Sequence, residues 1–125
     1  MLSTIDTIPT IAVKNIKEAR EFYEKKLGLR PTGGGNEYVQ HYKCGHTTVE
    51  VYESEFAGTN KATSLTWEAG NNLEKEVKEL KDKGITFEHY DFPDSRLEGD
   101  IHVMKDMKAA WFKDPDGNIL CIHGQ

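Results

Sequence analysis

One stretch of the chain has the residue pattern of a complete β-hairpin: Lys108-Ala109-Ala110-Trp111-Phe112-Lys113-Asp114-Pro115-Asp116-Gly117-Asn118-Ile119-Leu120-Cys121-Ile122. Asp114 suits the first position of a type I turn, Pro115 presets φ at the next position, and Gly117 suits a left-handed residue. This chemistry predicts a three-residue loop with a bulge, which would place Trp111 opposite Cys121. Apolar residues on both arms predict that the hairpin belongs to the core.

A strand followed by a helix occurs twice upstream of this hairpin. The expected strands are Thr7–Val13 and Thr63–Ala69. Each is followed by an asparagine, a glutamate three residues later, and a glycine: Asn15, Glu18 and Gly28, then Asn71, Glu74 and Gly84. The first two residues are typical of a helix start and the glycine of a helix end. Because the two sets lie 56 positions apart, we interpret the pattern as an internal duplication.

Further β-rich segments follow each helix. They lie around Arg30 and at Tyr38–Lys43, Thr47–Ser54, Thr86–Asp91, Met107–Lys113 and Ile119–His123. Each half is therefore predicted to be a βαβββ module, the first over residues 5–54 and the second over 63–125, with a linker at 55–62. We expect a single α+β domain whose modules form one curved, mostly antiparallel sheet with the helices outside.

Two segments between these elements are ambiguous from sequence. The Gly33–Gly35 run could hold a phosphate, but it does not open a helix, so a hairpin turn is favoured. Asp91–Asp106 is expected to be irregular. Irregular segments of this length are usually functional or disordered, which makes this one a candidate cover for a site.

The composition excludes several classes of function. A net charge of −5 without a basic stripe argues against nucleic-acid binding. The sequence has no apolar run of membrane-spanning length and no signal-peptide pattern. Cys44 and Cys121 form no disulfide framework or zinc motif, which favours a reducing, cytoplasmic environment.

Strand alternation separates an apolar face from a polar one in each half. Within Thr47–Tyr52, Val49 and Val51 should face the helix, which leaves Thr48, Glu50 and Tyr52 on the other face. In the second half, Leu65 and Trp67 alternate in the same way with Ser64 and Thr66. A tight Cys44-Gly45 turn would place His41 opposite Thr48, on the face of Glu50. We expect the polar faces to line a ligand pocket.

The chain resembles the glyoxalase/bleomycin-resistance (vicinal oxygen chelate) superfamily from about residue 5 to its end. The resemblance is carried by the repeated module and by three segments: Ile11-Ala12-Val13-Lys14-Asn15-Ile16; Phe22-Tyr23 with Leu27-Gly28-Leu29; and Trp111-Phe112-Lys113-Asp114-Pro115-Asp116-Gly117-Asn118. It implies the glyoxalase fold and often a homodimer. It leaves the activity open, because the superfamily contains metal-dependent enzymes and metal-free binding proteins.

In metal-dependent members the first and last strands of each half tend to supply the ligands. Carried over by eye, these positions are Ile8, Glu50, Ser64 and Cys121. Only Glu50 is an ordinary ligand for a hard metal ion. The resemblance therefore implies a site without the usual metal and without another cofactor. A non-standard set of Glu50, His41 and His123 is an alternative, and the role of His102 is open.

Two functions remain open at this point. One is the binding of a small organic molecule in a pocket between the modules. The other is a metal-dependent lyase, isomerase or dioxygenase in which Glu50 is a ligand or general base. Trp111 fits either core packing or a pocket wall, and Cys121 fits a small core residue better than a nucleophile. The expected ligand contacts, besides Glu50, are Thr10, His41, Thr48, Tyr52, Ser64, Thr66, Trp111 and Cys121.

Overall fold

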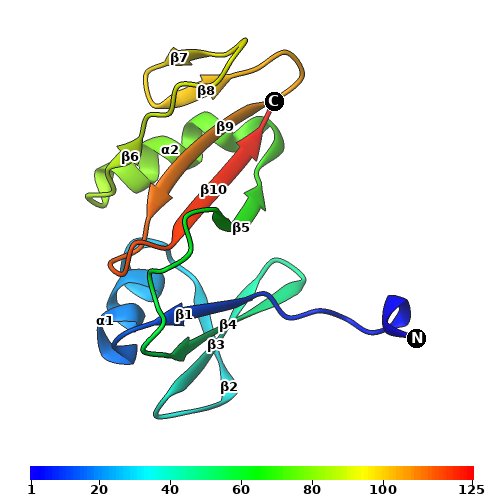
Figure 1. Cartoon of the computed structure of the whole chain (residues 1–125), viewed down its shortest axis with the longest axis vertical. Helices are drawn as coiled ribbons and strands as arrows, with labels where there is room; N and C mark the ends of the chain where they lie inside the picture. The colour runs from blue at the N-terminus through cyan, green and yellow to red at the C-terminus, as the bar shows by residue number, and fades with distance from the viewer. The chain divides into compact units, whose positions relative to one another are not determined.

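The computed structural model describes residues 1–125, and the chain divides into two compact modules, Met1–Gly58 and Thr59–Gln125 (Figure 1). Each module contains one mixed sheet and one main helix, so the predicted α+β class and the repeated strand–helix–strand order are confirmed. The strands hydrogen-bond into two separate open sheets, one in each module. No helix combines the length and the apolar character needed to span a membrane.

The first module is a four-stranded sheet that packs against one helix. Its elements are η1 (Leu2–Thr4), β1 (Thr10–Val13), α1 (Ile16–Arg20), η2 (Glu21–Lys26), β2 (Arg30–Asn36), β3 (Val39–Cys44) and β4 (Thr47–Glu53). The strand order is β1-β4-β3-β2. β1 runs parallel to β4 and the other pairs are antiparallel. This order places β1 and β4, the first and last strands of the module, side by side.

The first helix begins as predicted, but it changes type before its end. The Asn15 side chain accepts a hydrogen bond from the backbone N–H of Glu18 at 3.0 Å, which satisfies one of the free donors at the helix start. We expected one continuous helix to Gly28. Instead α1 ends at Arg20 and continues as the π-helix η2. Gly28 then ends it with a φ of +72°.

The core of the first module lies between this helix and one face of the sheet. Val49 and Val51 are 1% and 0% exposed, and Phe22 and Tyr23 are buried against the same face. A buried side chain of this size contributes roughly 1.5–3 kcal/mol. Tyr42 is also fully buried, and its hydroxyl donates to Glu24 at 2.8 Å, so the phenol is not left unpaired.

The second module has a six-stranded sheet. Its elements are β5 (Thr63–Glu68), η3 (Gly70–Asn72), α2 (Leu73–Asp82), β6 (Phe87–Glu88), β7 (Arg96–Glu98), β8 (Ile101–Val103), β9 (Lys108–Lys113) and β10 (Ile119–Gly124). The strand order is β5-β10-β9-β8-β7, and β6 also pairs with β9. As in the first module, the first and last strands, β5 and β10, are parallel neighbours.

The predicted start of the second helix at Asn71 is wrong. Asn71 lies inside the 3₁₀ turn η3, and the residue that precedes α2 is Asn72, whose side chain makes no capping hydrogen bond. The reason is the chain reversal at Gly70, which has a φ of +55° and donates its backbone N–H to the Glu68 side chain at 3.0 Å. The predicted end at Gly84 is correct, with a φ of +91°.

The Asp91–Asp106 segment is not irregular throughout. Arg96–Glu98 and Ile101–Val103 pair as an antiparallel hairpin, in which Glu98 lies opposite Ile101. The two residues between them form the turn, and Gly99 has the positive φ of +63° that such a turn requires. The hairpin is attached to the sheet by the pairing of His102 with Ala109.

The hairpin at 108–122 has the predicted register and loop. Trp111 lies opposite Cys121. The Asp114 carboxylate is buried inside the loop and accepts backbone hydrogen bonds from Asp116 and Asn118, both at 2.9 Å. Gly117 has a φ of +89° and donates its N–H to the Asp114 carbonyl. A buried carboxylate with several donors holds the loop in one conformation.

The triple glycine does not form the turn that we expected. Gly33–Gly35 lie within the edge strand β2, where the pairing with β3 shifts between Thr32 and Asn36, and the turn follows at Glu37 and Tyr38. The close approach of β3 explains the glycine at position 35. A Cβ atom there would lie 2.2 Å from the Val39 carbonyl oxygen.

We predict that Gly35→Ala destabilises the protein by about 2 kcal/mol, because a backbone carbonyl must shift to admit the methyl group. Gly33→Ala is the matched control, since a Cβ at Gly33 has no neighbour within 4 Å. Chemical denaturation of both variants tests this. Equal midpoints would contradict the close approach.

Candidate functional site

The face of the first sheet that points away from the helix carries the predicted polar residues. Thr10 on β1 lies directly opposite Glu50 on β4, and Ala12 lies opposite Tyr52. Strand alternation therefore gathers Thr10, Thr48, Glu50 and Tyr52 on one face, while Val49 and Val51 enter the core. The Glu50 side chain is 32% exposed and so remains open to solvent.

His41 joins this face, but in a different register from the predicted one. It lies opposite Glu50 rather than Thr48. The turn consists of Gly45 and His46, not Cys44 and Gly45, because Gly45 supplies the positive φ at the first turn position. The residue opposite His41 is two positions further along β4 than predicted. Because side chains alternate along a strand, a shift of two residues leaves His41 on the predicted face.

His41 and Glu50 form a hydrogen-bonded pair. His41 Nε2 lies 2.9 Å from Glu50 Oε1, and the His41 side chain is 22% exposed. A carboxylate only accepts hydrogen bonds, so Nε2 carries the proton of this bond. The imidazole is thereby oriented, and Nδ1 is its other polar atom, close to Gly34.

The second carboxylate oxygen of Glu50 is available to a ligand. Thr10 Oγ1 lies 3.5 Å from it, at the long limit of a hydrogen bond. That hydroxyl lies 2.9 Å from the Ile8 carbonyl, so its single proton belongs to the shorter bond. Glu50 Oε2 is therefore an open acceptor beside an oriented imidazole.

The second module repeats this strand pairing with different chemistry. Thr66 on β5 lies opposite Cys121 on β10, as Thr10 lies opposite Glu50. The two threonines are 56 positions apart, which is the interval of the sequence duplication. The first-strand residues directly opposite Glu50 and Cys121 are thus Thr10 and Thr66, whereas Ile8 and Ser64, the positions that the resemblance implies, lie two residues earlier. Ile8 precedes β1 and Ser64 lies at a bulge of β5, where its hydroxyl accepts from Asn60 at 3.3 Å.

Cys121 is a buried thiol. It is 1% exposed, and burial raises its pKa to about 11, although a hydrogen bond with Thr66 acts in the opposite direction. The thiol is therefore protonated at neutral pH and is neither a nucleophile nor a ready metal ligand.

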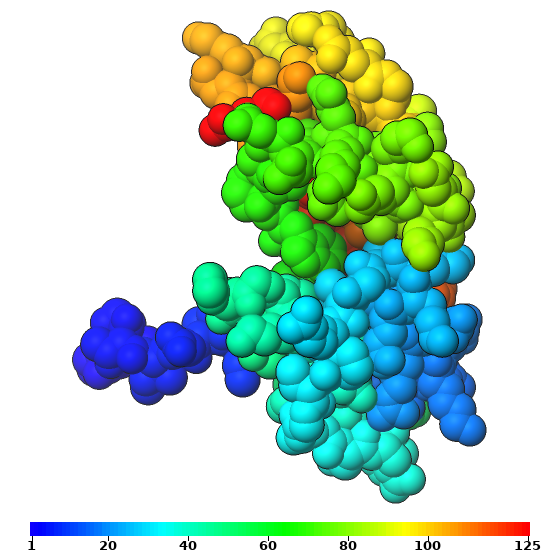
Figure 2. Space-filling view, turned by 180° about the vertical axis from the view of Figure 1, so that it is seen from behind, coloured from blue at the N-terminus to red at the C-terminus, as the bar shows by residue number.

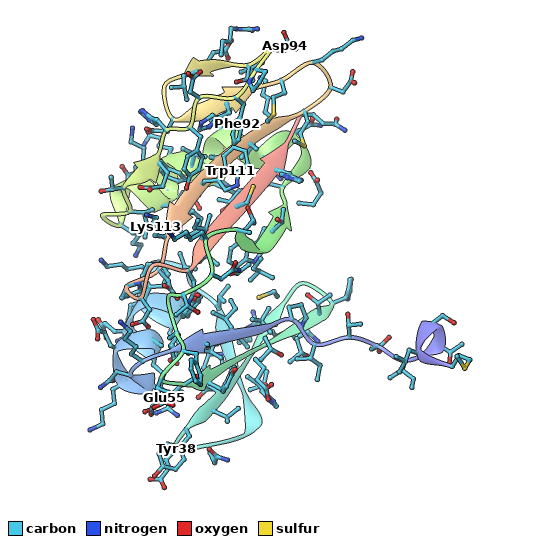
Figure 3. The ribbon with its side chains drawn as sticks, viewed as in Figure 1. Tyr38, Glu55, Phe92, Asp94, Trp111 and Lys113 are labelled. Atoms are coloured by element: carbon cyan, nitrogen blue, oxygen red, sulfur yellow. The ribbon has the colours of Figure 1, made fainter.

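Trp111 lies on the same face as Cys121, next to aromatic residues that the sequence analysis missed. Its indole N–H donates to Thr63 Oγ1 at 3.1 Å, and its ring centroid lies 4.9 Å from that of His102 and 5.3 Å from that of Phe92. Phe92 and Trp111 are labelled in Figure 3. The signal that could have found them is the alternation of Tyr90 and Phe92, where the expected strand Thr86–Asp91 meets the segment that we expected to be irregular.

Of the non-standard set, the structure brings His41 and Glu50 together. His123 lies on β10 in the second module, where its Nδ1 is 3.8 Å from Glu68 Oε2. Within each module, no three His, Cys, Asp or Glu side chains are grouped so that they could hold a metal ion.

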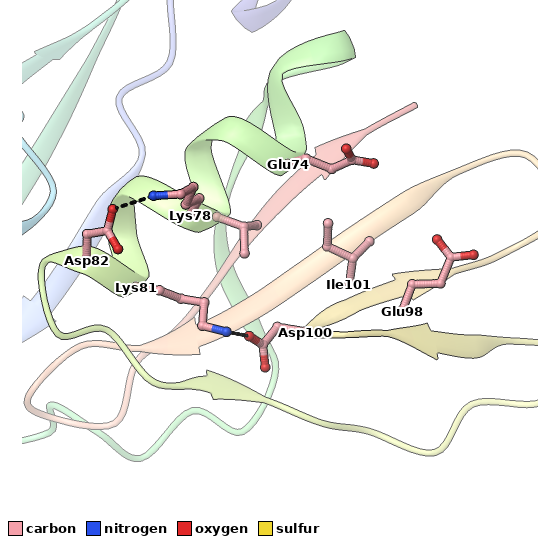
Figure 4. Close-up of a pocket in the computed structure, with 8 residues that line it drawn as sticks. Glu74, Lys78, Lys81, Asp82, Glu98, Asp100 and Ile101 are labelled. Carbon is pink, nitrogen blue, oxygen red and sulfur yellow. Dashed lines mark hydrogen bonds and ion pairs between the residues drawn. The ribbon is translucent and has the colours of Figure 1, made fainter.

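A cavity of about 400 Å³ lies elsewhere in the second module, between α2 and the β7–β8 hairpin (Figure 4). Its walls are mostly charged. Lys81 Nζ lies 2.7 Å from Asp100 Oδ2, and His89 lies 2.8 Å from the other Asp100 oxygen. The Lys81 hydrogen bond, followed by that of His89, lowers the pKa of Asp100. These groups satisfy one another, so the cavity has no chemistry directed at a ligand.

We predict that Cys121 in the native protein reacts with iodoacetamide at pH 8 roughly 100-fold more slowly than Cys44, because few of its buried thiols are ionised. The rate should rise as the pH approaches 11. Mass spectrometry of the Cys44→Ser variant isolates the Cys121 reaction, and guanidinium chloride should abolish the protection. Equal rates in the native protein would contradict the burial.

Comparison with known proteins identifies the family. The model of the Glyoxalase/Bleomycin resistance protein/Dioxygenase superfamily matches residues 4–122. No curated protein matches the chain. Among solved structures, a glyoxalase family protein from Enterococcus faecalis is similar, with a TM-score of 0.72 and 21% identity over 98% of this chain and 99% of that one.

A fosfomycin resistance protein and a lactoylglutathione lyase share the fold at a lower sequence identity than the Enterococcus faecalis protein. Fosfomycin resistance protein FosX from Listeria monocytogenes, in complex with Mn(II) and sulfate, has a TM-score of 0.71 and 13% identity over 99% of this chain and 91% of that one. Lactoylglutathione lyase from Agrobacterium tumefaciens has a TM-score of 0.69 and 13% identity over 96% and 93%. The match to the family model covers nearly the whole chain, and the chain therefore belongs to the glyoxalase/bleomycin resistance protein/dioxygenase superfamily.

Proposed function

We propose that the chain binds a small organic molecule on the polar face of the first module and that Glu50 is its main polar contact. The observation that supports this is the open Glu50 Oε2 atom beside an imidazole that Glu50 itself orients. A half-exposed carboxylate with a free acceptor favours a cationic or hydrogen-bond-donating ligand. Cys44 and Cys121 are not joined in a disulfide, and this favours a cytoplasmic location.

The residues around Glu50 add shape and further contacts. Tyr52 lies two residues along the same strand face, opposite Ala12 on β1 and Val39 on β3. Its small neighbour on β1 leaves the face of the phenol ring available for packing against a ligand. Thr10, Thr48 and His41 complete the first-module contacts. Ser64, Thr66, Trp111 and Cys121 are the contacts proposed for a ligand on the second module.

The residues at the family's metal positions do not fit the usual metal. By the resemblance these positions are Ile8, Glu50, Ser64 and Cys121, a set with one alkyl side chain, one carboxylate, one neutral hydroxyl and a thiol kept protonated by burial. Thr10 and Thr66, which lie directly opposite Glu50 and Cys121, add only neutral hydroxyls. Hard divalent ions prefer several carboxylate, carbonyl or imidazole ligands. A metal-dependent lyase, isomerase or dioxygenase is the alternative function, and it would need ligands from other positions, such as His41.

We predict that Glu50→Gln weakens ligand binding at least tenfold, or ~1.4 kcal/mol, and leaves the melting temperature unchanged or slightly higher. The amide oxygen can still accept from His41, while the cost of a partly desolvated charge is removed. A ligand is first found by a thermal-shift screen of small molecules, and its affinity is then measured by calorimetry.

Glu53→Gln is the matched control, because Glu53 is exposed at the end of the same strand and on its other face. It should bind as wild type does. Unchanged affinity and activity in Glu50→Gln would move the site away from Glu50.

We expect protein purified without chelator to hold well under one equivalent of zinc, nickel, manganese or iron, because the donor set is poor in metal ligands. Elemental analysis measures this directly. One full equivalent that is lost in Glu50→Gln would favour the metal-dependent enzyme and reject the proposed site chemistry.

We also propose a homodimer in which the N-terminal segment contacts a second copy. The segment extends away from the sheet of its module (Figures 1 and 2), and it exposes four apolar side chains: Met1, Leu2, Ile5 and Ile8. Exposed apolar side chains gathered on one segment are typical of an interaction surface. A twofold pair is the commonest closed assembly.

Light scattering at micromolar concentration should give twice the chain mass of 14.2 kDa. The double substitution Leu2→Ser with Ile5→Ser should reduce the mass to that of one chain. A wild-type protein of single-chain mass would reject the dimer.

A further inference from the structure

Four side chains form an aromatic cluster on the second module: Tyr90, Phe92, His102 and Trp111. Every pair of ring centroids in this cluster lies between 4.9 and 6.0 Å apart. Trp111 comes from β9, His102 from β8, and the other two from the connection between β6 and β7. Trp111 is also one of the ligand contacts proposed above, whereas Tyr90, Phe92 and His102 belong to no site described so far.

His102 has a defined protonation pattern. Its Nε2 atom accepts a hydrogen bond from the backbone N–H of Tyr90 at 2.9 Å, so Nε2 is unprotonated. The neutral ring must then carry its proton on Nδ1. This Nδ1–H has no hydrogen-bond partner, and the residue is 0% exposed.

The Tyr90 hydroxyl is a second buried polar group without a partner. Burial raises the pKa of this phenol, so it remains a protonated donor at neutral pH. Buried polar groups in native proteins are nearly always hydrogen-bonded, and each unpaired one costs stability. These two unpaired donors on adjacent rings are therefore groups that an acceptor from outside the chain would satisfy.

We propose that the aromatic cluster is a binding site for a planar, neutral molecule that presents a ring-nitrogen or carbonyl acceptor. The acceptor takes the free donors of His102 Nδ1–H and Tyr90 O–H, and the flat ring stacks on Trp111. A neutral ligand suits this site, because a ring nitrogen or a carbonyl oxygen accepts a hydrogen bond without bringing a charge into the buried cluster. This inference does not depend on the function proposed for Glu50.

Phe92 is the cover of this site. Its ring lies against both Trp111 and His102 and is 38% exposed, whereas His102 is fully buried beneath it. Phe92 is carried by a segment outside the strands, which also contains Asp94, the one non-glycine residue with a positive φ, at 57°. Movement of Phe92 away from Trp111 opens the place where the ligand ring stacks.

Quinoline and indole are a suitable pair of probes. Both are planar and bicyclic, but quinoline has a ring-nitrogen acceptor and no donor, while indole has a donor and no ring-nitrogen acceptor. Titration of ¹⁵N-labelled protein is followed at the two indole N–H signals, which are assigned with Trp111→Phe. Quinoline should shift the Trp111 signal saturably and leave that of Trp67, which stacks on Phe112, in place. Indole should bind at least tenfold more weakly.

The nitrogen signals of the His102 ring give a direct test of the donor. In the free protein they should show a protonated Nδ1 and an unprotonated Nε2, and quinoline should move the Nδ1–H proton downfield. The opposite tautomer, or no change at Nδ1 on saturation, would overturn the proposal.

Substitutions separate binding from folding. Tyr90→Phe removes one unpaired hydroxyl, so it should maintain or raise the melting temperature and weaken quinoline binding severalfold. Tyr38→Phe, at an exposed tyrosine of the first module, is the matched control and should change neither. Phe92→Ala should tighten quinoline binding because it removes the cover.

Absence of a saturable quinoline shift in the wild type would mean that water satisfies these donors, and it would reject the site. Wild-type affinity in Tyr90→Phe, equal affinity for indole, or weaker binding in Phe92→Ala would also contradict it. If Glu50→Gln loses the ligand found in the thermal-shift screen but still binds quinoline, the result concerns the Glu50 site and leaves the aromatic-cluster site unaffected.

Discussion

The parallel pairing of the first and last strands in each module is the constraint on which the site depends. A parallel pair needs a long connection, and each module supplies it with a helix followed by antiparallel strands. Because side chains alternate along a strand, burial of Val49 and Val51 beneath the helix forces Glu50 onto the opposite face. The register then sets Thr10 beside Glu50 and Thr66 beside Cys121.

The features that could be predicted from sequence are those that local residues determine. The loop at Asp114 closes within five residues, and its turn chemistry led to the correct pairing of Trp111 with Cys121. The cap at Asn15 is local in the same sense. The fold class followed from the repetition of such local patterns at a constant interval.

The errors arose where a neighbouring strand or turn decides the outcome. The position of His41 depends on which two residues form one turn, and both choices contain Gly45. Gly33–Gly35 look like a turn, but the approach of the Val39 carbonyl explains Gly35 within a strand. In the candidate site, the face of Glu50 could be predicted by alternation. The hydrogen bond between Glu50 and His41 could not be predicted, because it depends on the register of β3 and β4. The His102 cluster could not be predicted either, because it depends on a hairpin that has only three residues in each strand.

The equivalence of Thr10–Glu50 and Thr66–Cys121 has an evolutionary consequence. When a structural unit is present twice in one chain, one copy can lose its original chemistry while the other retains it, and the scaffold is maintained by both. The first copy here has an open acid, and the second has a buried, neutral thiol at the corresponding place. The two copies also differ on the neighbouring strand, where His41 lies opposite Glu50 and Trp111 lies opposite Cys121, so one framework carries two half-sites of different chemistry.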